Sequence, residues 1–239
     1  AQAEQIKRTP KKKQPPLLYD LTELQRDANK QYNYTAKETL NIMQRLYENH
    51  KVLTYPRTDS RYLSQDIVPT IKERLKACSV GPYRKIAGTL INRPLAQKMA
   101  FVDNSKVSDH HAIIPTRELQ KCNLSELPKG ELAILQLISN RLCVAVGDPH
   151  RYAETVIELD CGGTVFSTKG KTVVQDGWKA LVQKNDSTKS DENVQTLPSV
   201  SVGDEMTVSG TEIKEGKTSP PKHFTEDTPV SYTHLRAHE

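Results

Sequence analysis

The hydrophobic pattern of this chain changes its period at Pro149. Before this residue, apolar side chains recur every three or four positions, as in amphipathic helices; after it they alternate with polar ones. The runs YAETVIELD and TVFSTKGKTVV meet at a CGG turn, which predicts a β-hairpin, and GDEMTVSGTEIKEG predicts another strand. We therefore expect an α+β protein, with an α-rich domain over residues 17–149 and a β-rich module over residues 150–217.

Helix signals are strongest in the first half of the chain. Capping-box patterns that start at Asp20 and Thr35 predict two amphipathic helices joined by a short turn. In the second of these helices the predicted core stripe is Ala36, Leu40, Met43 and Tyr47. Further helices are expected from Ser64, over residues 82–100 with breaks at Gly88 and Pro94, and over residues 130–146 as a buried helix.

Composition limits the class of protein. The 239 residues carry a net charge of +5, which permits a polyanionic partner without requiring one. No apolar run approaches the roughly 18 residues of a membrane span, and no signal peptide precedes the chain. The four cysteines form no CxxC pair, which argues against a zinc ribbon and favours reduced thiols. We expect a soluble, cytoplasmic protein in which residues 1–16 form a basic connector or strand end.

The segment LTYPRTDSRYL, residues 53–63, places a tyrosine among charged side chains. An ordinary tyrosine at such a position is half-buried, with a hydrogen-bonded hydroxyl. Here Pro56 fixes the backbone beside Tyr55, and Arg57 offers a planar set of donors that suits a phosphate. A nearby guanidinium eases deprotonation of a phenol, whose pKa is about 10, and stabilises charge on a phosphorane-like transition state. A nucleophile with an anion clamp is therefore an alternative to the structural interpretation.

A second polar segment, SDHHAIIPT, covers residues 108–116. Adjacent histidines such as His110 and His111 rarely bind one metal, because consecutive side chains diverge. They could form a loop pair, with one exposed and one bonded to a backbone group. They could instead contact phosphate, since a histidine gains charge readily near an anion. The residues alone leave both interpretations open.

Together these segments resemble the type IA DNA topoisomerases, and most closely the bacterial topoisomerase III branch. LTYPRTDSRYL is similar to the family's active-site segment and DHHAIIPT to its second signature. LYDLTELQRDANKQYNYTAKETLNIMQRLYE resembles the helical pair that leads to the tyrosine, GKTVVQDGWKAL a segment of the β-rich module, and SPPKHFTEDT the start of the next helical domain. The resemblance covers residues 15–228.

The resemblance implies roles for individual residues. Tyr55 would attack one DNA strand and form a 5′-phosphotyrosine, leaving a free 3′-hydroxyl, so that strand passage and religation need no ATP. Arg57 would hold the scissile phosphate. The implied DNA contacts are His110, His111, Thr58, Asp59, Ser60 and Arg61, with Thr58, Asp59 and Ser60 positioning the active-site turn. The β-rich module would be the hinge or arch of a multidomain, toroidal fold.

The resemblance also implies features beyond this sequence. The family's amino-terminal domain, whose acidic cluster binds Mg²⁺, has no counterpart here, so we expect no metal site in this chain and little cleavage by the chain alone. The expected partners are single-stranded or negatively supercoiled DNA and, for the longer enzyme, a helicase; the enzyme would act at the nucleoid. Residues 218–228 would begin the next domain, and PVSYTHLRAHE, residues 229–239, does not continue the family pattern and is interpreted as a foreign tail.

Two other functions compete with this interpretation. Relaxase-type nickases also use a tyrosine, but they need separated histidines that hold a metal, and His110 and His111 are adjacent. A non-catalytic single-stranded DNA-binding module would use Tyr55 to stack on a base, and Arg57 and Arg61 to follow phosphates. A Tyr55→Phe substitution separates the second alternative from catalysis, because it keeps the ring and removes the nucleophile.

Overall fold

The computed structural model divides the chain into two compact units. One consists of Ala1–Gln14 and Asp148–Pro221, and the other contains Pro15–Gly147. The chain thus visits the first unit twice, with the second unit inserted between the visits, and it combines helices and strands as predicted. The residues that the structure describes are 1–79, 84–95, 99–182, 197–213 and 215–220.

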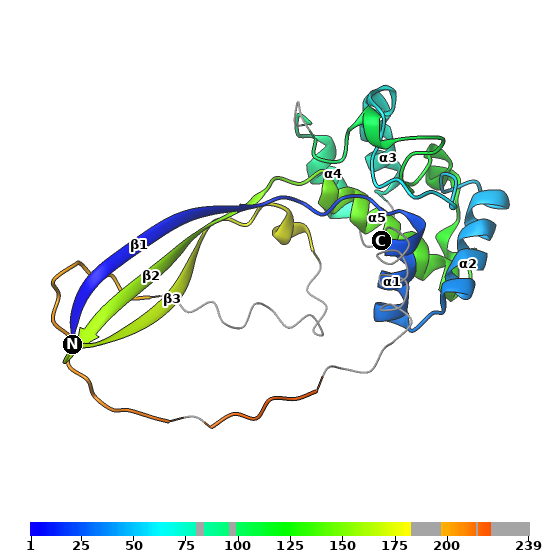
Figure 1. Ribbon diagram of the computed structural model, residues 1–239. Helices are drawn as coiled ribbons and strands as arrows, with labels where there is room; N and C mark the ends of the chain where they lie inside the picture. Colours follow the sequence, from blue (N-terminus) through cyan, green and yellow to red (C-terminus); the bar gives the residue numbers. More distant parts are fainter. Residues whose placement is uncertain (80–83, 96–98, 183–196, 214, 221–239) are drawn as a thin grey trace. The chain divides into compact units, whose positions relative to one another are not determined.

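The first unit contains an antiparallel sheet in the order β1–β2–β3, whose strands lie side by side along their length (Figure 1). β2 and β3 form the predicted hairpin. Its turn holds Gly162 and Gly163 at φ values of 63° and 86°, the left-handed conformation that tight hairpin turns require. The Asp160 carboxylate accepts a hydrogen bond from the Gly163 N–H at 2.9 Å. The strands are β1 (Gln2–Lys13), β2 (His150–Cys161) and β3 (Thr164–Gln175).

For the beginning of the chain the sequence leaves a connector and a strand end open, and in the structure Gln2–Lys13 form the edge strand β1. This strand pairs with β2 from Gln2, opposite Asp160, to Lys13, opposite His150. β1 is rich in lysine and contains Pro10, both of which edge strands tolerate. Its sequence therefore lacks the apolar alternation by which strands are recognised, and the sheet unit extends beyond residues 150–217 to include the chain start.

The strand predicted over residues 203–216 is wrong for the part of this segment that the structure describes. Only Glu205 forms a bridge there, to Gln2, while the Ala3 N–H donates to the Asp204 carbonyl at 3.0 Å. Further on, the side chain of Ile213 is 94% exposed. An alternating sequence becomes a strand only where a neighbour supplies hydrogen bonds. The first residues of the chain supply them to residues 203–206, and no described strand pairs with residues 207–213. The suspected tail at residues 229–239 lies outside the described residues.

The second unit is built around the buried helix α5, which contacts α1, α2 and α4 (Figure 1). The predicted helix over residues 130–146 is confirmed by α5. No described helix is long and apolar enough to cross a bilayer. All four cysteines are free. The α-helices are α1 (Leu21–Tyr32), α2 (Ala36–Glu48), α3 (Ile71–Ala77), α4 (Arg84–Ile91) and α5 (Lys129–Ala145). The 3₁₀ segments are η1 (Gln65–Thr70), η3 (Asn104–Lys106), η4 (Arg117–Lys121), η5 (Leu124–Glu126) and, in the first unit, η6 (Gly177–Leu181).

The two predicted helix starts are confirmed by their caps. The Asp20 carboxylate accepts from the Glu23 N–H at 2.7 Å. At α2 the capping box is complete, since the Thr35 hydroxyl accepts from the Glu38 N–H at 3.1 Å and the Glu38 carboxylate accepts from the Thr35 N–H at 2.8 Å. Each cap satisfies backbone donors that would otherwise lack a partner at a helix start.

The buried stripe of α2 is rotated from the predicted one. Of the predicted residues only Met43 is buried, and the observed stripe follows the spacing i, i+3, i+4, i+7. Leu40 and Tyr47 are half-buried beside it. The sequence offers two adjacent apolar stripes, and packing against α1 and α5 selects between them. The buried residues are Thr39, Ile42, Met43 and Leu46.

Two further helices differ from their predictions. The helix expected from Ser64 is divided into η1 and α3, because Pro69 has no N–H to donate and lies in the tighter 3₁₀ turn. Helix α4 begins at Arg84, passes through Gly88 without a break and ends before Pro94. The predicted helix is therefore too long over residues 92–95 and 99–100, whereas its residues 82–83 and 96–98 lie outside the described residues.

Candidate active site

The two polar segments found in the sequence lie side by side. Leu53 and Pro115 form an antiparallel bridge. The Thr54 N–H donates to the Ile114 carbonyl at 3.0 Å, and the Thr54 hydroxyl accepts from the Ile114 N–H at 3.0 Å. These contacts join residues 53–63 to residues 108–116, and they bring the side chain of Tyr55 to His110.

The ring of Tyr55 packs between two other rings. Its centroid lies 4.2 Å from that of His110, at an interplanar angle of 34°. Tyr47, on α2, contacts it edge to face at 5.7 Å. Pro56, the next residue, is buried. Tyr55 itself is half-buried, and among the described residues its hydroxyl has no hydrogen-bond partner, which leaves this oxygen available to a substrate.

Thr58 and Ser60 anchor the turn that follows the tyrosine. The Thr58 hydroxyl donates to the His110 carbonyl at 3.1 Å, and the Thr58 carbonyl accepts from the Leu21 N–H at 3.0 Å. The Ser60 hydroxyl donates to the Lys106 carbonyl at 2.7 Å. Both side chains are buried, at 5% and 6% exposure. The Thr58 hydroxyl thus holds the tyrosine segment against the histidine segment, and the Ser60 hydroxyl holds it against Lys106, shortly before that segment.

Arg57 and Asp59 alternate with these buried residues and are exposed. Within the described part of the chain, neither side chain makes a hydrogen bond or an ion pair. The guanidinium of Arg57, two residues from Tyr55, is therefore free of internal partners. A free guanidinium beside an unpartnered tyrosine hydroxyl is an arrangement that can hold a phosphate next to a nucleophile.

The two adjacent histidines have different environments. His110 is exposed and stacks on Tyr55, whereas His111 is half-buried. The His111 Nδ1 atom lies 2.7 Å from the Ala112 carbonyl, and the tautomer that carries a proton on Nδ1 donates to it. Burial lowers the pKa of His111, and the charge of Arg74 acts in the same direction. His110 is thus placed to meet a ligand, while His111 is held by the backbone.

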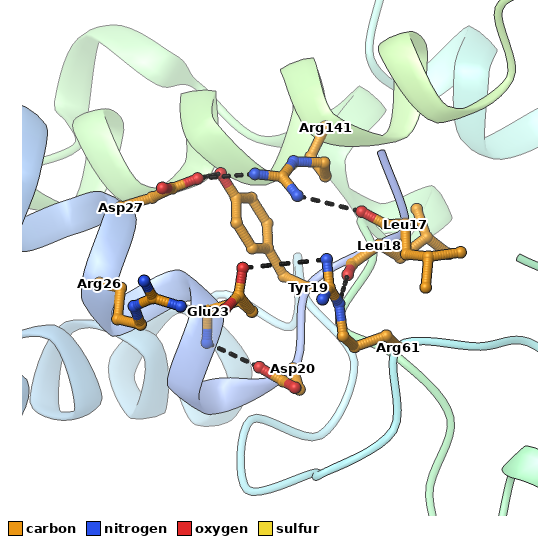
Figure 2. A network of polar contacts seen from close by, with 9 residues as sticks. All are labelled: Leu17, Leu18, Tyr19, Asp20, Glu23, Arg26, Asp27, Arg61 and Arg141. Atoms are coloured by element: carbon orange, nitrogen blue, oxygen red, sulfur yellow. Dashed lines mark hydrogen bonds and ion pairs between the residues drawn. The ribbon is translucent and has the colours of Figure 1, made fainter. Parts of the chain in front are cut away.

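A polar network fixes the backbone of residues 17–20, which precede α1, to α1 and α5 (Figure 2). The Asp27 carboxylate accepts from the Tyr19 hydroxyl at 2.6 Å and from the Arg141 guanidinium at 2.6 Å. Arg141 also donates to the Leu17 carbonyl at 3.1 Å and lies 3.9 Å from the centre of the Tyr19 ring. Burial raises the pKa of Tyr19 well above its usual range, so this hydroxyl remains a hydrogen-bond donor.

Arg61 connects the tyrosine segment to the same backbone (Figure 2). Its Nε donates to the Leu18 carbonyl at 3.2 Å. Its Nη2 lies 3.8 Å from the Glu23 carboxylate, which also pairs with Arg26 at 2.7 Å. The guanidinium of Arg61 is thus engaged inside the protein, which suits a positioning role; its predicted contact with DNA stays a prediction.

Sequence reasoning missed three residues of this arrangement. Tyr47 appeared as a core residue of α2, although an aromatic residue shortly before the tyrosine segment is a signal for a ring contact. Asp27 and Arg141 showed no signal, because their pairing joins helices distant in the sequence. No group of three or more His, Cys, Asp or Glu side chains is placed to hold a metal ion in the part of the chain that the structure describes. The Mg²⁺ implied by the resemblance therefore has no fitting site among these residues.

Comparison with known proteins defines the class. Residues 1–232 match the model of a protein family described as DNA topoisomerase. The chain belongs to this family, the type IA DNA topoisomerases. The match extends to residue 232, slightly beyond residue 228, where the resemblance seen in the sequence ends.

Its curated relatives include several bacterial enzymes named DNA topoisomerase 3. The chain is 45% identical over 227 residues to that of Bacillus licheniformis and 44% identical over 229 residues to that of Bacillus subtilis strain 168. Each match covers 95% of this chain and 31% of the relative, so the chain spans about a third of these relatives. Among solved structures, full-length topoisomerase I from Thermotoga maritima matches with a TM-score of 0.66 and 22% sequence identity. The match covers 98% of this chain and 37% of the Thermotoga chain, which shows a shared fold.

Proposed function

We propose that this chain carries the nucleophilic tyrosine of a type IA DNA topoisomerase. The proposed reaction is transient cleavage of one DNA strand by Tyr55, passage of another strand through the break, and religation. The observation that supports it most is the contact between Tyr55 and His110, with a ring-centroid distance of 4.2 Å, in a site where Tyr55 and Arg57 have no other polar partners among the described residues. Family membership supports DNA as the substrate.

The proposed step is an exchange of phosphodiesters. The Tyr55 oxygen forms a bond to a backbone phosphorus as the bond between that phosphorus and the 3′ oxygen breaks. The phenol loses its proton, and the leaving 3′ oxygen acquires one. Because a phosphodiester is replaced by another, the reverse attack by the 3′-hydroxyl restores the strand without ATP.

The surrounding residues take roles that follow from their partners. Arg57 neutralises the charge that grows on the phosphate oxygens, and His110 contacts the DNA backbone beside the cut. Thr58 and Ser60 position the turn through their hydrogen bonds to the carbonyls of His110 and Lys106. Asp59 and His111 line this turn and are predicted to lie near the DNA.

The remaining proposals concern the longer enzyme. The sheet unit would act as the hinge or arch of a toroidal enzyme, and Mg²⁺ would be held by residues outside this sequence. Single-stranded or negatively supercoiled DNA is the proposed substrate, at the nucleoid, with a helicase as a partner. These proposals rest on the family, since this chain covers 31% of its curated relatives.

The test uses the complete gene product that contains this sequence. The protein is mixed with single-stranded DNA labelled at its 3′ end, denatured with detergent, and examined for label that stays attached to the protein. We expect adducts with the unchanged protein and with Tyr47→Phe, whose ring is retained. Tyr55→Phe should give none, with DNA affinity within about twofold. Arg57→Gln should lower the rate of adduct formation by about 100-fold, the usual effect of removing one transition-state donor.

The outcomes separate the proposal from its rival. Adducts formed by Tyr55→Phe would show that another residue is the nucleophile. DNA binding without adducts in the unchanged protein would favour the alternative function, a non-catalytic single-stranded DNA-binding module.

A further inference from the structure

The charges of the sheet are divided along its length. The half formed by residues 7–13, 150–156 and 169–175 contains eight basic side chains and one acidic one, Glu154. The other half contains three acidic side chains and no basic one. The basic residues are Lys7, Arg8, Lys11, Lys12, Lys13, Arg151, Lys169 and Lys171, and the acidic ones of the other half are Glu4, Glu158 and Asp160.

The register of the strands places five of the lysines on one face. Residues directly opposite each other in antiparallel strands project to the same side of a sheet. Lys7 and Lys169 both lie opposite Val156, and Lys171 lies opposite Glu154. Lys11 and Lys13 lie opposite Tyr152 and His150, two and four residues before Glu154 on the same side. We call this set the lysine face: Lys7, Lys11, Lys13, Lys169 and Lys171.

Few carboxylates neutralise the lysine face. Among the described residues its one ion pair joins Lys11 to Glu154, at 4.0 Å. Lys7, Lys13 and Lys169 are exposed and have no carboxylate within that distance in the described part of the chain. Like charges held together on a rigid sheet repel one another, and a bound polyanion would relieve this repulsion.

Aromatic rings lie among these lysines. The Trp178 indole N–H donates to the Lys13 carbonyl at 3.2 Å, and the ammonium of Lys13 lies 5.9 Å from the indole centre. Lys171 lies 5.7 Å from the ring centre of Tyr152, which stacks on His150 at 5.4 Å. Cationic side chains interleaved with aromatic rings are the combination by which proteins hold single-stranded nucleic acids, through phosphates and bases respectively.

We infer that the lysine face is a second DNA-contact surface, which binds the backbone of single-stranded DNA with Trp178 beside a base. It belongs to the sheet unit, whereas Tyr55 belongs to the helical unit. The choice of DNA over another polyanion rests on the proposed function. The role is binding alone, and no catalytic group is involved.

The experiment exploits Trp178, the single tryptophan of the chain. The complete chain is titrated with an oligothymidylate labelled at one end, and anisotropy reports binding while intrinsic fluorescence reports the environment of Trp178. The variant Lys7→Gln/Lys13→Gln/Lys169→Gln removes three charges of the lysine face. The control Lys37→Gln/Lys72→Gln/Lys121→Gln removes three exposed lysines of the helical unit, so that net charge is matched.

We expect the oligonucleotide to quench Trp178. Each lost phosphate contact on a single strand lowers the slope of log affinity against log salt by about 0.7, so the lysine-face variant should flatten this slope by about 2. Its affinity at low salt should fall about tenfold, with the control within about twofold of the unchanged chain.

Other results would overturn the inference. DNA binding with Trp178 unchanged and with equal loss in both triple variants would place the DNA elsewhere and leave the proposed function standing. Polyglutamate that competes as well as DNA would indicate an acidic protein as the partner. Absence of binding by the unchanged chain at low salt would reject the surface, and the adduct assay at Tyr55 would still decide the proposed function separately.

Discussion

At the scale of residues, the hydroxyl groups of Thr58 and Ser60 and the guanidinium of Arg57 have separate roles in the site. Thr58 and Ser60 are buried, and their hydroxyls donate to backbone carbonyls, whereas Arg57, directly before Thr58, is exposed and has no polar partner among the described residues. The alternation follows from the extended backbone, which points successive side chains to opposite sides. Anchoring and phosphate binding are therefore combined within a few residues.

Removing the Thr58 hydroxyl should loosen this anchor. In Thr58→Val the His110 carbonyl and the Ser60 N–H lose their partner, so the free energy of unfolding should fall by about 1–3 kcal/mol. In the complete enzyme, adduct formation should slow while DNA affinity is kept. Thr58→Ser, which retains the hydroxyl, is the matched control and should restore the rate. Equal rates for Val and Ser variants would show that the hydroxyl does not position the site.

His111 should make the protein less stable in acid. Its folded pKa lies below the ordinary 6.5, because burial disfavours the imidazolium. The unfolded chain then binds more protons near this pH, so the stabilisation is present above about pH 6.5 and is lost as the pH falls towards the folded pKa. His111→Asn keeps a donor at the position of Nδ1 and does not titrate. Urea unfolding at pH 7, 6 and 5 should show a steeper loss for the unchanged chain; parallel losses would contradict the assignment.

At the scale of elements, the conformation of one glycine fixes the end of the sheet. Gly177 is the first residue of η6, has a φ of 56°, and lies against the backbone carbonyls of Asp148 and Pro149. A Cβ atom there would lie 2.5 Å from the Asp148 carbonyl oxygen. The Asp148 carbonyl also accepts a hydrogen bond from the backbone N–H of Trp178 at 2.7 Å, so η6 is held close to the start of β2.

Gly177→Ala should therefore disturb the sheet unit. The substitution combines left-handed backbone strain with an atomic overlap, and its cost should exceed about 1 kcal/mol. Trp178, the next residue, reports the change as a lower midpoint of unfolding in its fluorescence. Gly210→Ala is the control, since no atom lies within 4 Å of the added Cβ. Identical midpoints for the two variants would reject the strain at Gly177.

Elements with a local signal could be predicted from the sequence, and those that depend on distant partners could not. The two glycines after Cys161 predict the hairpin because the turn needs their conformation, and the Thr35 box predicts the start of α2. β1 is a strand only because β2 pairs with it. Residues 207–213 alternate polar and apolar side chains but form no strand, because no described strand pairs with them. In the site, the resemblance pointed to Tyr55 and His110, but their ring contact and the Asp27–Arg141 pair arise from packing between segments far apart.

At the scale of the whole molecule, the described part of the chain passes between its units at two places. The chain enters the helical unit at Pro15, after β1, and leaves this unit at Gly147, after α5. The polar network holds the incoming chain through Arg141, whose side chain is 15% exposed, and Asp27. The network lies entirely within the helical unit, so its loss should act on that unit first.

Asp27→Asn should weaken the helical unit selectively. It leaves the Arg141 guanidinium without its carboxylate in a largely buried site, at a cost of about 2 kcal/mol or more. The unfolding transition followed by far-ultraviolet circular dichroism should move to lower urea, while that followed by Trp178 stays. Lys121→Gln, which breaks an exposed pair with Glu118, should change neither. A joint shift of both signals would show that the units unfold together.

The central claim is that Tyr55 is the residue that joins DNA. The most direct measurement is to trap the covalent complex of the complete gene product on single-stranded DNA, trim the DNA with nuclease, digest the protein and locate the nucleotide by mass spectrometry. The site described above predicts a nucleotide attached through its 5′-phosphate to the peptide that contains Tyr55. Attachment to Tyr47, to Tyr62 or to His110, all near this segment, would contradict it.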